Sequence, residues 1–123
     1  MKKLLIIGHT FPEPTTTAAG SRMLQLIQVF LEDNYSITFA STASSGDKSA
    51  DLQNLGISSE TIQLNNSSFD DFLRKENPTI VLFDRFITEE QFGWRVSEVC
   101  PEALKILDTE DLHFLRKARE IAV

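Results

Sequence analysis

The residues best suited to chemistry lie in one short segment near the C-terminal end of the chain. An apolar run over 104–107 is followed at once by four ionisable residues, Asp108, Glu110, Asp111 and His113. Carboxylates and an imidazole can accept protons, orient hydroxyl groups or bind divalent cations. An apolar run of this length is typical of a buried strand, and open parallel sheets bind ligands just beyond the carboxyl ends of their strands. The segment therefore predicts part of a binding or catalytic site.

Two further groups have chemistry suited to the same edge of a sheet. Asp84 and Arg85 follow another apolar run, and Gly20, Ser21 and Arg22 open a helix after the first strand. Free backbone amides at a helix start can hold an anion or a sugar hydroxyl, and guanidinium groups bind phosphate or carboxylate through two hydrogen bonds. A flexible loop that ends in an ordinary serine cap explains Gly20 and Ser21 equally well.

Simpler structural roles also explain the C-terminal segment. The spacing from Asp108 to His113 matches no metal-binding motif, and acidic residues in the first turn of a helix favourably offset its dipole, so we predict no metal site. Asp111 and His113 lie two residues apart on the expected helix and point to different faces, which argues against a direct pair. Arg116 is either a ligand for an anion or part of a solvated helix face.

Five apolar stretches of strand length alternate with helical patterns. The strands are expected at 4–7, 37–40, 62–64, 80–83 and 104–107. The apolar helical stripes are Met23, Leu24, Ile27, Phe30 and Leu31; Phe69, Phe72 and Leu73; Phe92, Val96 and Val99; and Leu112, Leu115 and Ala118; a short helix over 50–55 is also expected. This alternation predicts an α/β fold, a Rossmann-like doubly wound parallel sheet of about five strands in a three-layer αβα arrangement, with strand order 3-2-1-4-5.

Local signals suggest how some helices begin and what they expose. Ser67 and Ser68 are candidate N-caps, and Thr88 is followed by two acids in the first turn of the next helix. Trp94 lies off the apolar stripe of that helix. It is interpreted either as a contact for another domain or partner, or, preferably, as partly buried in the core.

Length and charge restrict the classes of protein that remain. The 123 residues predict one domain over 1–123. A net charge of −6 and a pI near 4.8 oppose attachment to nucleic acid or to anionic lipid. The sequence contains neither a GxGxxG nor a GxxxxGK[ST] motif at a strand end, and we predict no bound cofactor.

The chain shows no sign of export or of a membrane span. The apolar run that begins the sequence ends at Gly8, too early for a signal peptide, and no run reaches the roughly 20 apolar residues that cross a bilayer. Cys100 is the only cysteine and precedes Pro101. An inert thiol in a cytoplasmic protein is the expectation.

Three segments together resemble a known family. They are the first strand with its Pro/Thr-rich loop leading to Gly20 and Arg22, the stretch 86–96, and the stretch 106–116. These resemble the N-terminal domain of glycosyltransferases of the two-domain B-type fold, close to the family 4 group. The resemblance covers essentially the whole chain, although 44–76 contributes little.

The resemblance implies transfer of a sugar from a nucleotide-sugar donor to an acceptor. Gly20, Ser21 and Arg22 would approach the donor, and the segment from Asp108 to Arg116 would line the acceptor side. His113 would be the histidine that contacts the transferred sugar. The nucleotide would be held mainly by a C-terminal domain that this sequence lacks, so the chain alone is expected to be inactive. Peripheral membrane contact is expected only in a full-length protein.

The alternative is a stand-alone doubly wound module that binds or senses a ligand. The last expected helix runs to Val123 without a stop signal, which favours a fragment of a longer protein. A receiver-type module is disfavoured because His9 follows the first strand, where such a module has acids, and Asn65 follows the third, where it has a phosphorylatable aspartate.

Overall fold

The computed structural model describes residues 2–8, 18–42, 56–63, 66–84 and 86–108. These form a five-stranded, all-parallel sheet in the order β3-β2-β1-β4-β5, which confirms the predicted fold class and strand order. The elements are β1 Lys3–Gly8, α1 Ala18–Glu32, β2 Ser36–Ser41, β3 Ser58–Thr61, α3 Ser68–Glu76, β4 Ile80–Asp84, α4 Phe86–Val99 and β5 Leu104–Asp108. The helices predicted over 50–55 and from Leu112 onward lie outside the described residues.

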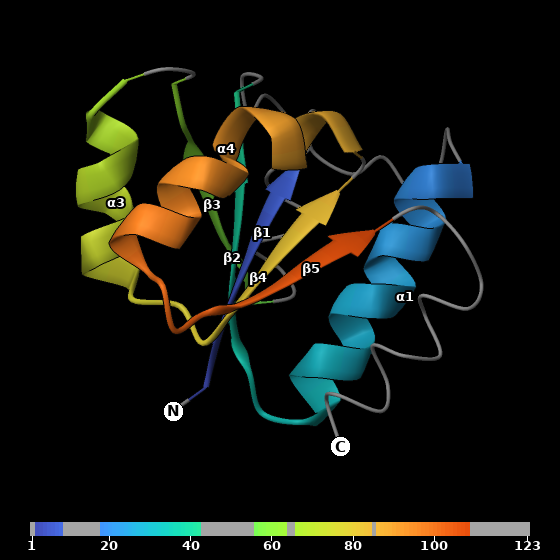
Figure 1. Ribbon diagram of the computed structural model, residues 1–123. Coiled ribbons are helices and arrows are strands. Elements are labelled where there is room, and N and C mark those ends of the chain that lie inside the picture. Colours follow the sequence, from blue (N-terminus) through green and yellow to red (C-terminus); the bar gives the residue numbers. More distant parts are fainter. Residues whose placement is uncertain (1, 9–17, 43–55, 64–65, 85, 109–123) are drawn as a thin grey trace.

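Helices cover both faces of the sheet, with α1 on one face and α3 and α4 on the other (Figure 1). The alternation of side chains along each strand produces this division. In β1, Leu4 and Ile6 pack on the α1 side, whereas Leu5 and Ile7 pack on the side of α3 and α4. All four are at most 1% exposed, as expected for a central parallel strand covered on both faces.

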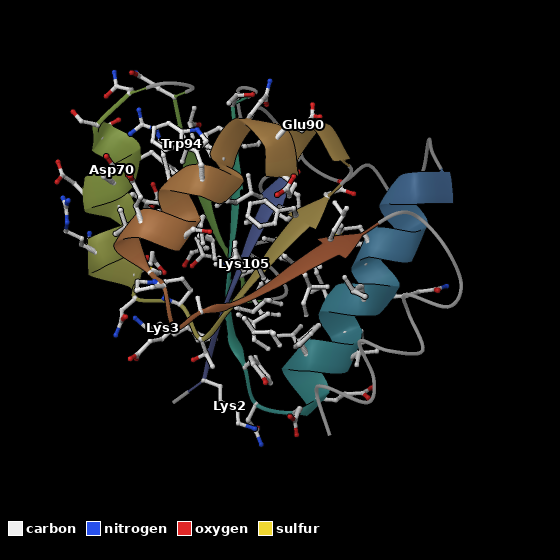
Figure 2. All side chains as sticks on the ribbon, in the orientation of Figure 1. Lys2, Lys3, Asp70, Glu90, Trp94 and Lys105 are labelled. Carbon is white, nitrogen blue, oxygen red and sulfur yellow. The ribbon has the colours of Figure 1, made fainter. Side chains whose placement is uncertain are left out.

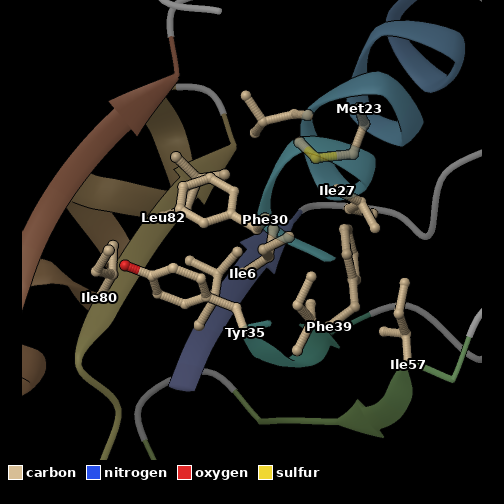
Figure 3. Packing of buried hydrophobic residues seen from close by; sticks show 12 residues of the cluster. Ile6, Met23, Ile27, Phe30, Tyr35, Phe39, Ile57, Ile80 and Leu82 are labelled. Atoms are coloured by element: carbon tan, nitrogen blue, oxygen red, sulfur yellow. The ribbon is translucent and has the colours of Figure 1, made fainter. Parts of the chain in front are cut away.

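The core beneath α1 is built on the predicted helical stripe. Met23, Ile27 and Phe30 are buried against the sheet, in one cluster with Ile6 and Leu82 (Figure 3). The Phe30 ring meets the Tyr35 ring edge-on, with centroids 5.0 Å apart, a favoured aromatic geometry. Burial of one such side chain contributes about 2 kcal/mol to stability, so this stripe is the main attachment of α1 to the sheet.

The second core lies between the sheet and the pair α3 and α4. Phe69 and Leu73 of α3 and Phe92 and Val96 of α4 are all buried. The Phe69 and Phe92 rings have centroids 4.8 Å apart. The two helices are therefore joined by direct aromatic contact as well as by the strands beneath them.

The third strand was predicted wrongly over 62–64, because β3 spans Ser58–Thr61. As an edge strand that pairs only with β2 among the described strands, β3 is mostly exposed and carries polar side chains. The buried Ile62 directly follows it, and its amide donates to the Ser41 carbonyl. The apolar signal in the sequence therefore marks Ile62, which follows the strand, and not the polar strand itself.

The capping of α3 also differs from the prediction. Ser67 has helical backbone angles and makes no side-chain cap bond. Instead, the Asn66 side-chain oxygen accepts a 2.9 Å hydrogen bond from the Ser68 amide. Asn66 therefore satisfies one of the free amides at the start of this helix, a role asparagine fills as well as serine does.

The preferred interpretation of Trp94 as partly buried core is wrong. Its side chain lies on α4 (Figure 2) and is 51% exposed. The neighbouring core positions Phe92 and Val96 point into the second core, which leaves position 94 facing outward. Within the described part of the chain, no helix is long and apolar enough to span a membrane.

Candidate functional site

The carboxyl ends of the strands define the candidate site. The crossover from β1 to β2 runs through α1 on one face of the sheet, whereas that from β4 to β5 runs through α4 on the other. Because β1 and β4 are neighbours in the sheet, the chain leaves these two adjacent strand ends toward opposite faces of the sheet. Doubly wound folds bind ligands in the crevice at such a switch point.

The start of α1 lies at this same end of the sheet. The arrowheads of β1, β4 and β5 and the first turn of α1 share one end of the molecule (Figure 1). Gly20, Ser21 and Arg22 fall in the opening turns of α1, which begins at Ala18 and has no acidic residue in its first turn. The amides and positive dipole end at the start of a helix attract anions, and the first turn of α1 carries no carboxylate of its own.

The tip of β4 is fastened to the helix that follows it. The Thr88 hydroxyl donates a 2.8 Å hydrogen bond to the Asp84 carbonyl oxygen, and the Thr88 side chain is 1% exposed. This bond joins the end of β4 to the first turn of α4. The partly exposed Asp84 is thereby held on a fixed backbone, which a residue that orients a ligand requires.

Asp84 and Asp108 occupy matching positions on neighbouring strands. The register between β4 and β5 pairs Asp84 with Asp108 at the carboxyl edge. Carboxylates accept hydrogen bonds from hydroxyl groups, so an acidic pair of positions here suits a polyol ligand. The Asp108 backbone is described, but its side chain is not.

The structure tests the other predicted site residues only in part. Gly20, Ser21 and Arg22 are placed by their backbone alone. The remaining candidates lie outside the described residues; they are Arg85, Asp111, His113 and Arg116. The catalytic role of His113 therefore stays a prediction.

Two polar residues that line up with this edge were missed from the sequence. Thr88 was noted only as a helix start, yet its buried hydroxyl fixes the tip of β4. Ser41 ends β2 with 0% exposure, and its carbonyl accepts from the Ile62 amide. A hydroxyl residue four positions after a strand end is the signal that could have identified Thr88. No comparable signal marks Ser41.

The described residues contain no cluster of three or more His, Cys, Asp or Glu side chains that could hold a metal ion. Burial raises the pKa of the Cys100 thiol. Cys100 lies far along the sheet from the carboxyl edge, before the start of β5.

A pocket of about 410 Å³ lies at the opposite, amino edge of the sheet. Its lining comes from the turns before β4 and β5 and consists of Asn77, Pro78, Thr79, Val99, Cys100, Pro101, Glu102 and Ala103. The thiol of Cys100 is buried, and its sulfur lies 3.8 Å from the Leu73 carbonyl oxygen. This pocket is remote from the switch point and contains none of the predicted site residues.

A scan against protein-family models found no match for this chain, and searches of the curated proteins and of the solved structures found no similar protein.

Proposed function

We propose that the chain is the N-terminal, acceptor-side domain of a glycosyltransferase that moves a sugar from a nucleotide-sugar donor to an acceptor. The observation that carries the proposal is the switch point between β1 and β4, where the start of α1 and the tip of β4 lie at one end of the sheet. The resemblance of three segments of the sequence to such domains gives the reaction class.

The two sides of the switch point suit different parts of one ligand. The start of α1, with no acid in its first turn, favours the phosphates of a donor. The acidic positions Asp84 and Asp108 at the tips of β4 and β5 favour hydroxyl groups. A nucleotide-sugar has both kinds of group, phosphates and sugar hydroxyls.

In the proposed reaction, the bond between the sugar's anomeric carbon and the donor phosphate breaks as the acceptor oxygen bonds to that carbon. The departing diphosphate gains negative charge, which the amide end of α1 would help to stabilise. The acceptor hydroxyl gives its proton to the departing diphosphate or to water, and His113 is the proposed contact with the transferred sugar. Rate acceleration in such a reaction comes largely from holding both substrates in line.

A cytoplasmic location belongs to the same proposal. The single cysteine cannot form an internal disulfide, which suits a reducing compartment. Contact with a membrane surface is proposed only for a longer protein that contains the nucleotide-binding domain, because the net charge of −6 of this chain opposes anionic lipid.

The proposal is tested by calorimetric titration of the chain with a panel of nucleoside-diphosphate sugars, with a sugar-transfer assay run in parallel. We expect weak binding and no transfer. Asp84→Asn should weaken binding by about tenfold, since one charge-assisted hydrogen bond is lost. The control Asp71→Asn changes an exposed acid on α3 and should leave binding unchanged.

Sugar transfer by the 123-residue chain would contradict the two-domain proposal. Equal weakening by both variants would show that the tip of β4 is not the ligand site. Tight binding of a donor without transfer would favour the alternative, a stand-alone ligand-binding module.

A further inference from the structure

The outer surface of α4 combines a half-exposed tryptophan with two carboxylates. Trp94 is 51% exposed, and Glu90 and Glu98 are exposed one turn before it and one turn after it. Residues four apart lie on the same face of a helix. The three side chains therefore form a ridge, Glu90–Trp94–Glu98, called here the α4 ridge; Figure 2 shows Glu90 and Trp94 along α4.

Trp94 is held in place from one side by an ordered cation. The Arg95 guanidinium carbon lies 4.6 Å from the Trp94 ring centroid, a cation–π contact. Arg95 in turn donates a 2.8 Å hydrogen bond to an Asp70 carboxylate oxygen on α3. Because the Arg95 side chain is only 13% exposed, the indole stands on a support that ties α3 to α4.

The charge of the α4 ridge is negative. Asp70 neutralises Arg95 within their ion pair. No ion pair involves Glu90 or Glu98 within the described ranges. A docking partner therefore meets one aromatic surface with a carboxylate on each side.

We propose that the α4 ridge binds an arginine- or lysine-rich segment of a protein partner. A cationic side chain would stack on the indole, and its neighbours would pair with Glu90 and Glu98. Tryptophan is among the residues that carry most binding energy in interfaces, and a fixed side chain loses little entropy on binding. This site is separate from the carboxyl edge and does not depend on the proposed glycosyltransferase function.

Charge also argues against two other occupants. A second copy docked through the same ridge would bring four glutamates together, because a two-fold interface is self-complementary. An anionic lipid surface would be repelled by the same carboxylates. A basic polypeptide is the partner whose charge complements the ridge.

The test uses the fluorescence of Trp94, which is the only tryptophan of the chain. The full chain is titrated with a short peptide of alternating arginine and serine. We expect a saturable change in emission that weakens as salt is raised, because exposed ion pairs are screened. Glu90→Gln combined with Glu98→Gln should weaken binding by about fivefold, the effect of two exposed charge pairs.

The matched control combines Glu32→Gln with Glu60→Gln, two exposed acids on α1 and β3. It changes the net charge by the same amount and should leave the affinity within about twofold, as expected for distant surface charges. Trp94→Ala, followed by calorimetry, should also weaken binding by about fivefold.

Three outcomes would overturn the proposal. They are equal weakening by the two double variants, absence of a saturable signal, and self-association in sedimentation that Trp94→Ala abolishes. The first would show attraction by net charge alone, and the last would show that a second copy covers the ridge.

Discussion

At the scale of single residues, two neighbouring aspartates on α3 have different environments. Asp70 pairs with Arg95 at 2.8 Å, with side-chain exposures of 23% and 13%. Asp71 pairs with Arg74 at 2.9 Å, but both side chains are largely exposed. One oxygen of Asp70 and the Nε of Arg95 are buried without a hydrogen-bond partner, so the Asp70–Arg95 pair is sensitive to loss of either member.

Asp70→Ala should lower the free energy of unfolding by about 1–2 kcal/mol, because it leaves a mostly buried guanidinium without its counter-ion. Asp71→Ala should cost less than about 0.5 kcal/mol, as exposed pairs contribute little. Both acids lie in the first turn of α3, so the helix dipole affects them similarly. Urea unfolding measures the difference, and equal losses would show that burial of the ion pair is unimportant.

The thiol of Cys100 should be unreactive in the folded chain. Burial raises its pKa, so the thiolate that reacts with disulfide reagents is scarce. The pKa of this thiol is higher in the folded than in the unfolded chain. Its contribution to the free energy of unfolding is therefore complete below the ordinary thiol pKa and is lost as the pH rises above that value. Cys100→Ala should reduce this alkaline loss in urea unfolding. Rapid labelling of the native thiol at neutral pH would contradict the buried environment.

At the scale of elements, the ends of the helices depend on special backbone conformations. Asn77 ends α3 in the left-handed conformation, at φ 46° and ψ 60°, and its amide donates 2.8 Å to the Leu73 carbonyl. Asparagine and glycine tolerate this region, whereas other residues are strained there. Asn77 also precedes Pro78, which cannot continue a helix.

Asn77→Ala should therefore lower stability by about 1 kcal/mol, whereas Asn77→Gly should be close to neutral. Thermal unfolding of the two variants provides the comparison. If glycine were as destabilising as alanine, the asparagine side chain, not its backbone angles, would be the important feature.

The start of α1 allows stability and ligand binding to be separated. Gly20 lies inside this helix, where alanine is favoured over glycine by up to about 1 kcal/mol. Gly20→Ala should raise the melting temperature and yet weaken nucleotide-sugar binding, because a methyl group obstructs approach to the backbone amides. Calorimetry and thermal unfolding together measure both effects. Unchanged binding in a stabilised variant would remove Gly20 from the site.

Sequence patterns located the buried elements better than the exposed ones. The inner strands β1, β2 and β4 coincide with apolar runs because both faces of each are covered. The edge strand β5 is partly exposed, and it was located because it too carries an apolar run. The polar edge strand β3 lacked that signal. The start of α3 was misassigned because Asn66, Ser67 and Ser68 are all acceptable caps, and only geometry shows that Asn66 makes the bond.

At the scale of the whole molecule, the strand order could be predicted from general rules of topology, whereas the candidate site could be predicted only in part. Right-handed crossovers between parallel strands leave few possible strand orders, and the observed order is the predicted one. Sequence placed Asp84 and Asp108 at the carboxyl edge correctly. It could not show that Trp94 is exposed or that Thr88 fastens the tip of β4, since both depend on packing between elements.

The central claim is that ligands bind at the carboxyl edge beside the β1–β4 switch point. Amide chemical-shift mapping of the isotope-labelled chain with a nucleoside-diphosphate sugar tests it most directly. The shifts should gather at Gly8, Gly20, Asp84 and Asp108, which lie at the tips of β1, β4 and β5 and at the start of α1. Shifts confined to the opposite pocket, around Asn77, Thr79, Cys100 and Ala103, would contradict it.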